Sequence, residues 1–408
     1  MESALNIIEN PESLLAFNSH NELEFDSLNL HELGKTIDEP LFIFSPNKLK
    51  QNIDKFRTQF GEETIIAYPV KTNRTKSVLD IISKNKCTFV VSSLNELAKI
   101  IAFKEYGDVI YNNPAMSEKE ATKVAEEKIG FIVIESLEQL KLLNRCAEKV
   151  KTKANVLLRV KTSIVPKNSA YGTSIDLGLN LDEFKTALEE LEWMPHINLK
   201  GIHNHLRTQN IDINSWQENL EEISVFLVEL KKRDIDLQYL DLGGGFPSTY
   251  IKEAPSIKEI YSAWETELTQ IKRDFPETTV IIEPGRSIAA DAFVLLTKVL
   301  VEKKGNEENK IIILNTSTYI SSVDTMLAGI ELPVIPTKIM AEENKEKKSH
   351  HIRGCTLDPI DIFRDKVFLP EIKTHQSLIF LNIGAYVFST DLYDLEKPRI
   401  TAVKSRDT

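Results

Sequence analysis

The chain has few cysteines, no long apolar run and no stripe of basic residues. Its three cysteines, Cys87, Cys146 and Cys355, form neither a paired framework nor a metal-ligand spacing, so stability should not depend on disulfides. No apolar run approaches the roughly 20 residues that cross a bilayer, and the N-terminus lacks a basic region followed by an apolar one. The net charge of -11 argues against nucleic acid as a main partner. We therefore expect a cytoplasmic protein that binds neither membrane nor nucleic acid.

Regular alternation of strand-like and helix-like segments dominates the first two thirds of the chain. With 408 residues, the chain is long enough for two or three domains. Short β-branched runs that are apolar throughout suit a parallel sheet covered by helices. Eight such units predict a closed (β/α)8 TIM barrel of α/β class, and an open doubly wound sheet is the alternative. The runs are 64–68, 88–92, 108–111, 130–134, 155–160, 198–203, 239–242 and 279–283.

The pattern changes beyond about residue 290. Here the runs are typical of strands joined by turns, with little helix between them, at 311–314, 333–340, 366–369, 378–383 and 399–403. Two charged segments, 302–309 and 341–349, are each predicted to be a hairpin or a loop. The predicted domains are therefore a barrel at 44–290 and a mostly β domain at 291–408, after an N-terminal segment at 1–43.

A lysine follows the first run of the predicted barrel. Lys71 lies in Tyr-Pro-Val-Lys-Thr-Asn (68–73), between an apolar strand and a helical segment. A lysine at this end of a barrel strand would point a nucleophilic amine into the site. A solvated surface lysine is the alternative for any one such residue. The motifs downstream favour the functional interpretation, because each supplies something that a phosphorylated aldehyde cofactor needs.

Two later strand ends carry groups that suit such a cofactor. Gly243, Gly244 and Gly245 follow the seventh run, and three glycines let backbone N–H groups approach a phosphate closely, although a mobile turn is the alternative. Arg286, in Glu-Pro-Gly-Arg (283–286), suits a second phosphate contact. If the cofactor is pyridoxal phosphate, the carboxylate of Glu283 would keep the pyridine nitrogen of the cofactor protonated. A protonated ring is the stronger electron sink, which favours decarboxylation. An ion pair between Glu283 and Arg286 is the alternative.

Two histidines end the sixth run, in Gly-Ile-His-Asn-His (201–205). Successive side chains of a strand point to opposite faces, so His203 and His205 would lie on the same side, and such a pair could bind a metal. No cysteine or carboxylate follows at ligand spacing, so we predict no metal. An imidazole stacked on an aromatic cofactor ring explains one histidine, and a buried, hydrogen-bonded structural histidine explains the other.

Taken in order, these motifs resemble those of the fold-type III pyridoxal-phosphate decarboxylases. The matching segments are Tyr-Pro-Val-Lys-Thr-Asn, Gly-Ile-His-Asn-His, Leu-Asp-Leu-Gly-Gly-Gly-Phe-Pro, Glu-Pro-Gly-Arg and Gly-Ala-Tyr (384–386). This group contains the diaminopimelate, ornithine and arginine decarboxylases, and its barrel is similar to that of alanine racemase. The resemblance covers nearly the whole chain. It implies pyridoxal 5'-phosphate as cofactor, an N-terminal segment joined to the β domain, and a homodimer with shared active sites.

The resemblance also implies roles for individual residues. Lys71 would hold the cofactor covalently, His205 would stack on its ring, and Glu283 would face the pyridine nitrogen. Thr208 stands at the position of a serine that contacts the phosphate in the family. The full set of implied phosphate contacts is Thr208, Gly243, Gly244, Gly245, Gly285, Arg286 and Tyr386.

The chain departs from the family in the loop that carries a catalytic cysteine. The family pattern is Gly-Pro-x-Cys-(Asp/Glu)-Ser-x-Asp, whose cysteine comes from the partner subunit, whereas this chain has Gly-Cys-Thr-Leu-Asp-Pro-Ile-Asp (354–361). Leu357 therefore stands where the cysteine belongs, and Cys355 lies two residues early. Either a local rearrangement lets Cys355 act as proton donor, or Lys71 or water replaces it. A buried structural cysteine is a further alternative for Cys355.

Other departures concern the substrate. Val90 stands where many relatives have an aspartate, and Arg207 stands where glycine is usual. Arg207 either swings away or meets an anionic substrate. We hypothesise a substrate with a further carboxylate, such as a diaminopimelate-like or citrate-acylated diamino acid. Asp358 and Asp361 are candidates for contact with a distal substrate ammonium, and solvated turn carboxylates are the alternative.

The predicted activity is decarboxylation of an amino acid to the amine and CO2, for example in siderophore assembly. An amino-acid racemase is one alternative, but racemases with this barrel typically place an arginine against the pyridine nitrogen, where this chain would place Glu283. A non-catalytic binding or regulatory relative is the other alternative, and an intact Lys71 argues against it.

Overall fold

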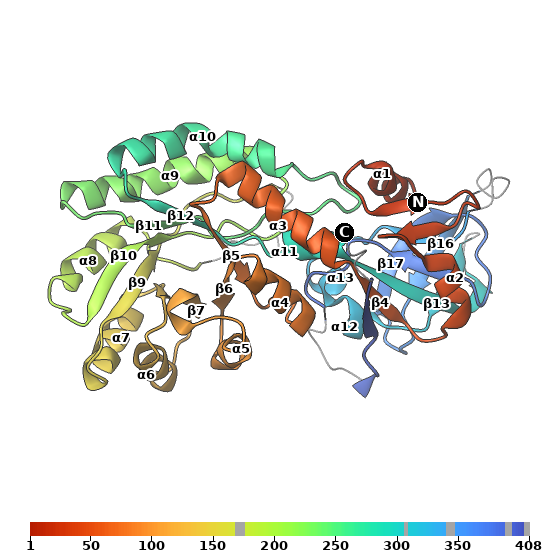
Figure 1. Ribbon diagram of the computed structural model, residues 1–408, viewed down its shortest axis with the longest axis horizontal. Helices are drawn as coiled ribbons and strands as arrows, with labels where there is room; N and C mark the ends of the chain where they lie inside the picture. The colour runs from red at the N-terminus through yellow and green to blue at the C-terminus, as the bar shows by residue number, and fades with distance from the viewer. Residues whose placement is uncertain (168–175, 306–308, 340–346, 388–393, 404–408) are drawn as a thin grey trace. The chain divides into compact units, whose positions relative to one another are not determined.

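The computed structural model describes residues 1–408 except 168–175, 306–308, 340–346, 388–393 and 404–408. The chain divides into two compact units (Figure 1). The barrel unit comprises Ile53–Pro247 and Pro255–Gly285. The β unit comprises Met1–Asn52, Ser248–Ala254 and Arg286–Thr408, so it contains both the N-terminal segment and the C-terminal part of the chain. Each unit is described by itself.

The barrel unit contains a closed barrel of parallel strands in the order β10-β11-β12-β5-β6-β7-β8-β9. The predicted TIM-barrel fold class is therefore confirmed, and each of the eight predicted runs is a strand whose bounds differ only at the ends. The strands are β5 (Ile65–Pro69), β6 (Thr88–Val91), β7 (Val109–Asn112), β8 (Phe131–Ile134), β9 (Ala154–Arg159), β10 (Ile197–His203), β11 (Tyr239–Asp241) and β12 (Thr279–Ile282).

Helices between the strands lie on the outside of the barrel (Figure 1). Several begin at a side chain that caps the first turn, as in the capping boxes of Ser117, Asn180 and Ser256. None of the described helices is long and apolar enough to span a membrane. The helices are α3 (Pro46–Phe60), which starts in the β unit, α4 (Lys76–Lys84), α5 (Leu94–Ile100), α6 (Glu118–Glu126), α7 (Leu137–Lys149), α8 (Leu181–Leu191), α9 (Ile213–Lys232) and α10 (Ile257–Asp274).

The interior of the barrel is a packed apolar core. One buried side chain from each of six strands joins a single cluster, which is the layered filling typical of this fold. Val90 belongs to this cluster, so its side chain packs in the core. The members are Ala67, Val90, Ile110, Val133, Leu157 and Ile281. This core fixes the strands whose carboxyl ends carry the candidate site.

The β unit contains a three-stranded sheet, β1-β2-β3, and an eight-stranded sheet. The larger sheet runs β15-β18-β13-β14-β16-β17, and β4 pairs with both β13 and β19. The mostly β character that was predicted for the C-terminal domain is confirmed. The strands are β1 (Leu15–Phe17), β2 (Leu23–Phe25), β3 (Leu28–Asn29), β4 (Leu41–Phe44), β13 (Phe293–Lys304), β14 (Lys310–Leu314), β15 (Val334–Pro336), β16 (Lys348–Arg353), β17 (Ile362–Leu369), β18 (Ser377–Phe380) and β19 (Arg399–Ala402).

Three features of the β unit differ from the predictions. The long strand β13 was not predicted; it extends into 302–309 and pairs antiparallel with β14, which agrees with the hairpin alternative for that segment. Strand β16 occupies the end of the segment 341–349, because its polar residues pair with β14 and β17 on either side. The β unit also contains short helices: α1 (Glu2–Glu9), α2 (Leu30–Thr36), α11 (Arg286–Ala289), α12 (Thr318–Ser321) and α13 (Val323–Leu327). The rest of the predicted run 333–340 beyond β15 forms no strand in the described part, and residue 340 lies outside it.

Candidate active site

Candidate residues gather at the carboxyl ends of the barrel strands. Lys71 lies just beyond β5, His203 ends β10, and the three glycines and Glu283 follow β11 and β12. Because the strands are parallel, these ends share one edge of the barrel. Lys71 is exposed there, and a turn closed by a hydrogen bond from the N–H of Thr72 to the carbonyl of Pro69 (3.0 Å) holds its backbone. The amine of Lys71 is thus available at the barrel mouth.

The ring of His205 is held by the glycine triplet. Its Nδ1 accepts a hydrogen bond from the backbone N–H of Gly244 over 3.1 Å. Burial, followed by the positive charges of Arg159 and Lys71, lowers the pKa of His205 to about 3. The imidazole is therefore neutral at physiological pH and fixed in orientation, as a side chain that stacks on an aromatic ring must be.

The three glycines are required by the backbone itself. Gly243 and Gly245 adopt φ angles of +65° and +100°, which side chains rarely tolerate. At Gly244, an added Cβ would lie 2.7 Å from the carbonyl oxygen of Glu283 and 3.4 Å from Cε1 of His205. The triplet therefore brings bare backbone close to His205 and Glu283. Such a glycine-rich turn suits the close approach of an anion.

Glu283, His203 and Asp241 form a buried polar cluster. Their ligand atoms lie within 4.8 Å of one another, and Nε2 of His203 is 3.6 Å from Oε1 of Glu283. Burial alone raises the pKa of Glu283, but the hydrogen-bonding contact with His203 and the positive charge of Lys71 act in the opposite direction, and the pKa lies below its usual range. Burial lowers the pKa of His203. The cluster thus presents a carboxylate beside neutral imidazoles.

A buried ion pair borders this cluster. Nη1 of Arg159, at the end of β9, lies 2.8 Å from Oε1 of Glu135, which follows β8. Both side chains are buried. Nδ2 of Asn112, at the end of β7, lies 3.4 Å from Nε2 of His203. Six neighbouring strand ends, from β7 to β12, therefore contribute polar groups to one mouth.

Arg286 lies in the β unit, where it is buried among aromatic rings. It donates to the hydroxyl of Tyr250 over 3.1 Å and pairs with Asp324 over 2.5 Å. Its guanidinium carbon lies 4.8 Å from the ring centroid of Tyr386. Arg286 and Tyr386, which both have predicted phosphate roles, are therefore in direct contact. Gly285, the residue before Arg286, packs its backbone against the hydroxyl of Thr72.

The loop 354–361 is organised by one of its own aspartates. The carboxylate of Asp361 accepts hydrogen bonds from the hydroxyls of Thr318 and Thr356, both at 2.8 Å, and from their backbone N–H groups. Asp358 accepts a hydrogen bond from the hydroxyl of Tyr319 at 2.5 Å. Both carboxylates thus have partners within the β unit, and a contact with substrate stays a prediction for each.

Cys355 and Leu357, which stands at the position of the family cysteine, are both exposed on this loop. The alternative of a buried structural cysteine is therefore wrong for Cys355. Burial of part of the side chain, and then the charge of Asp361, raise the pKa of the Cys355 thiol. Leu357 is 86% exposed. A thiol with a raised pKa keeps its proton at neutral pH, so the chemistry of a donor is present at Cys355 and absent at Leu357.

Arg207 and Thr208 follow His205 in the barrel unit. Arg207 is buried rather than turned out into solvent, and its carbonyl packs against Gly245. Thr208 is partly buried. Their predicted contacts with substrate and phosphate stay predictions.

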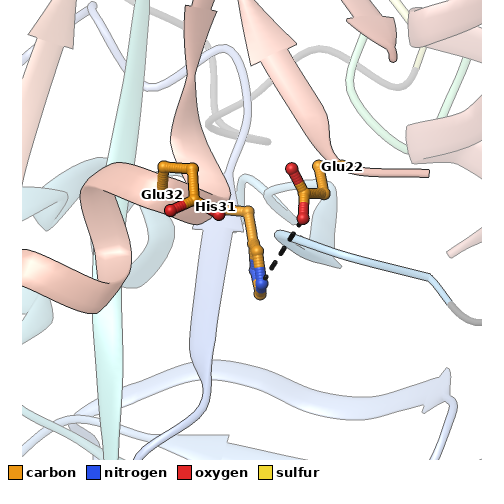
Figure 2. A group of neighbouring side chains, drawn as sticks. All are labelled: Glu22, His31 and Glu32. Atoms are coloured by element: carbon orange, nitrogen blue, oxygen red, sulfur yellow. Dashed lines mark ion pairs between the residues drawn. The ribbon is translucent and has the colours of Figure 1, made fainter. Parts of the chain in front are cut away.

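A second polar cluster lies in the β unit (Figure 2). Glu22 and His31 face each other, with His31 Nε2 3.9 Å from Glu22 Oε1. Hydrogen bonds from Asn29 and Lys338 lower the pKa of Glu22 to about 2. The ammonium of Lys338, 2.9 Å from Glu22, already supplies the positive charge that a cation would bring. We therefore assign this cluster a structural role.

Comparison with known proteins agrees with the geometry of the barrel. Residues 47–290 match the family model described as pyridoxal-dependent decarboxylase, pyridoxal binding domain. The diaminopimelate decarboxylase of Aquifex aeolicus is 27% identical over 94% of this chain and 90% of its own length. That of Haemophilus influenzae is 28% identical over 71% of each chain.

Solved structures show the same fold. The diaminopimelate decarboxylase of M. jannaschii in complex with L-lysine has a TM-score of 0.87 at 24% identity, covering 96% of this chain and 93% of that one. The Paramecium bursaria Chlorella virus arginine decarboxylase has a TM-score of 0.79 at 20% identity, covering 91% and 98%.

Fold, site and comparisons together define a pyridoxal-phosphate enzyme of the alanine-racemase barrel type. The chain belongs to the pyridoxal-dependent decarboxylases, so it is an amino-acid carboxy-lyase with pyridoxal 5'-phosphate as cofactor. Its residues fit that cofactor. The glycine triplet leaves room that a Cβ would fill, and Oε1 of Glu283 is buried without a hydrogen-bond partner among the described residues.

Several residues of the site were missed by sequence reasoning. Asp241, Arg159 and Glu135 are charged residues at or just after the ends of apolar strands. A charged residue at that position could have indicated from the sequence that its side chain belongs to the site. Tyr250 and Asp324 carried no such signal, because they contact Arg286 only through the tertiary fold.

Proposed function

We propose that the protein removes the α-carboxylate of a diamino acid, or of an acylated diamino acid, to give the amine and CO2. The observation that carries this proposal is Glu283, a buried carboxylate held among neutral imidazoles at the mouth that also bears Lys71. Pyridoxal phosphate, when bound, supplies an electron sink for the electron pair released from the Cα–carboxylate bond. A carboxylate at the ring nitrogen makes that sink strong, which favours loss of CO2 over racemisation.

Each residue of the barrel mouth would have a defined task. The amine of Lys71 would hold the cofactor. The neutral ring of His205, fixed by Gly244, would support the face of the cofactor ring, and the glycine triplet would receive the phosphate. Thr208, Gly285, Arg286 and Tyr386 remain predicted phosphate contacts on the strength of the family motifs.

The reaction needs a proton for Cα after CO2 has left. The Cα–carboxylate bond breaks, its electron pair remains at Cα, and a proton donor completes the new Cα–H bond. The Cys355 thiol, with its raised pKa, is protonated and suits this task. Lys71 or water is the alternative donor, because Leu357 occupies the position of the family cysteine.

The proposed substrate carries a further carboxylate. Arg207 replaces a glycine of the family pattern and is buried, with its backbone carbonyl against Gly245 of the glycine triplet. A guanidinium is permanently charged and can bind a carboxylate through paired hydrogen bonds. A diaminopimelate-like or citrate-acylated diamino acid has that group. The second kind of compound would place the enzyme in siderophore assembly.

We propose a homodimer for the active form. Leu357 and Ile360, on the loop that in the family reaches the partner's site, are 86% and 57% exposed. Large apolar side chains on an exposed loop suit burial against a second copy. Analytical ultracentrifugation of the wild type should show a dimer that Leu357→Asp weakens. A monomeric wild type at all concentrations would refute the dimer.

Mass spectrometry of products tests the activity. Cofactor-loaded protein is incubated with a panel of free and citrate-acylated diamino acids, and Lys71→Ala serves as control. Conversion of one compound to the amine lacking its carboxylate, lost in the variant, would support the proposal and identify the substrate class. Turnover of free ornithine alone would contradict the role given to Arg207.

A further inference from the structure

Two carboxyl groups lie side by side at the base of the barrel mouth. Asp241 ends β11, and Glu283 follows the neighbouring strand β12. The N–H of Glu283 donates to the carbonyl of Gly243 over 2.8 Å, which locks the two strand ends together. Both side chains are buried, and with His203 they place their ligand atoms within 4.8 Å of one another.

The hydrogen bonds around this pair are incomplete. Oδ1 of Asp241 accepts the N–H of Gly243 over 2.9 Å. Its Oδ2, and Oε1 of Glu283, have no hydrogen-bond partner among the described residues. Buried carboxylate oxygens without donors are costly, and a proton between the two groups would satisfy one oxygen of each.

The charged groups facing the pair cannot balance two negative charges. Arg159, on β9, is a buried cation whose charge acts on Asp241, but it is already paired with Glu135 at 2.8 Å. His203 and His205 are neutral, because burial lowers the pKa of both. Lys71, after β5, is left as the one cation acting on Glu283 that has no ion pair within the described residues.

We propose that Asp241 is a protonated carboxylic acid in the folded protein and donates its O–H to the carboxylate of Glu283. The pair then carries a single negative charge. That charge resides on Glu283, the group which under the proposed function faces the pyridine nitrogen. Asp241 is thus a positioning residue: it orients the Glu283 carboxylate and keeps a second negative charge away from the cofactor ring.

The electrostatic environment favours this location of the proton. Burial first, and then the negative charge of Glu283, raise the pKa of Asp241 well above its usual range. Contact with His203 and the positive charge of Lys71 act on Glu283 in the opposite direction. Two neighbouring acids whose environments differ in this way hold one proton between them, with the proton on the acid whose pKa is raised.

A divalent cation is the competing explanation, since a histidine and two carboxylates are also a metal-ligand set. The two explanations differ in the state of Asp241. A cation requires both carboxylates to be ionised, whereas the shared proton requires one neutral acid.

The test uses three proteins: wild type, Asp241→Asn and Asp241→Ala. Asparagine keeps an acceptor for the N–H of Gly243 and an amide donor for Glu283, so it mimics the neutral acid. Alanine removes both. Infrared spectra of each cofactor-free protein at neutral pH, in water and in deuterium oxide, are compared for the carbonyl band of a protonated carboxylic acid.

We expect an exchange-sensitive acid band in the wild type that both variants lack. We also expect Asp241→Asn to bind pyridoxal phosphate within about threefold of wild type, and Asp241→Ala to bind it at least about tenfold more weakly. A wild type without the band would overturn the proposal, and so would an asparagine variant as impaired as the alanine variant. A wild type that lacks the band as purified and gains it only after a chelator has removed bound metal would overturn it in favour of a cation site.

Stability against pH gives an independent readout. A raised carboxyl pKa stabilises the fold below the unfolded value, near 3.8, and that contribution is lost as pH rises toward the folded value. Asp241→Asn cannot lose it, so the variant should gain stability relative to wild type as pH rises to neutrality. A constant difference would contradict the proposal. The infrared and stability measurements need no substrate, so a negative result there would contradict the shared proton without contradicting the proposed decarboxylation.

Discussion

Nδ1 of His205 accepts a hydrogen bond from the backbone N–H of Gly244, with 3.1 Å between the two nitrogens. This bond links the segment after β10 to the glycine turn after β11. It therefore holds the ring that would support the cofactor in a fixed position relative to the backbone that would receive the cofactor's phosphate. Pre-organisation of this kind reduces the entropy lost when a ligand binds.

Replacement of Gly244 tests this relationship. In Gly244→Ala, the new Cβ would lie 2.7 Å from the carbonyl oxygen of Glu283, so the turn must shift. Overpacking of this kind costs about 1–3 kcal/mol. We expect affinity for pyridoxal phosphate to fall by about 10- to 100-fold, measured by absorbance titration. Gly107→Ala is the control, because a Cβ there meets nothing within 4 Å. Equal affinity in both variants would refute the assignment.

The neutral state of His205 predicts a pH dependence of stability. Its pKa falls from 6.5 in the unfolded chain to about 3 in the fold. As pH falls through this window, the unfolded chain binds a proton that the folded chain refuses, so the free energy of unfolding decreases. Urea denaturation of wild type and His205→Asn between these pH values should show a shallower decrease in the variant. Parallel curves would show that His205 is charged or exposed.

Arg207 should act on substrate binding. Loss of a hydrogen bond to a charged group costs about 1.5–3 kcal/mol, so Arg207→Ala should raise the KM for the acidic substrate by about 10- to 100-fold with little change in kcat. Arg207→Lys should retain part of the affinity. Arg233→Ala, at an arginine paired with Glu189 on the barrel surface, is the control. An unchanged KM would refute the carboxylate contact.

Cys355 is the predicted proton donor. Loss of a positioned general acid lowers rates by about 100-fold or more, so Cys355→Ala should lower kcat by that order while leaving cofactor absorbance intact. Leu357→Cys in the Cys355→Ala background restores a thiol at the family position and should recover activity. If Cys355→Ala retains full kcat, Lys71 or water is the donor.

The barrel could be predicted because its information is local. Most strands from β5 to β12 are short apolar runs, and burial on both faces removes ambiguity, as in β6. Strand β10 is the exception, because its first four residues are only half-buried. Strand β16 could not be found this way. Its sequence, Lys-Ser-His-His-Ile-Arg, is polar, and its strand structure depends on pairing with β14 and β17, which lie elsewhere in the sequence.

The site was predictable in part for the same reason. Lys71, Gly244 and Glu283 lie in motifs whose local order carries the chemistry. Asp241 lies in the same motif as the glycines, but its significance depends on the neighbouring carboxyl of Glu283, a contact between two strands. Asp361 was predicted as a candidate substrate ligand, but its carboxylate accepts hydrogen bonds from Thr356 in the same loop and from Thr318 in a distant segment. The contact with Thr318 depends on the tertiary fold, so the sequence could not show that Asp361 organises its own loop.

The most direct test of the central claim is a reaction of the cofactor-loaded enzyme in deuterium oxide, followed by mass spectrometry of substrate and product. Decarboxylation predicts an amine that has lost the α-carboxylate and gained one deuterium at Cα, with Lys71→Ala inactive. An amino acid that keeps its carboxylate while exchanging its Cα proton for deuterium would contradict the account and identify a racemase.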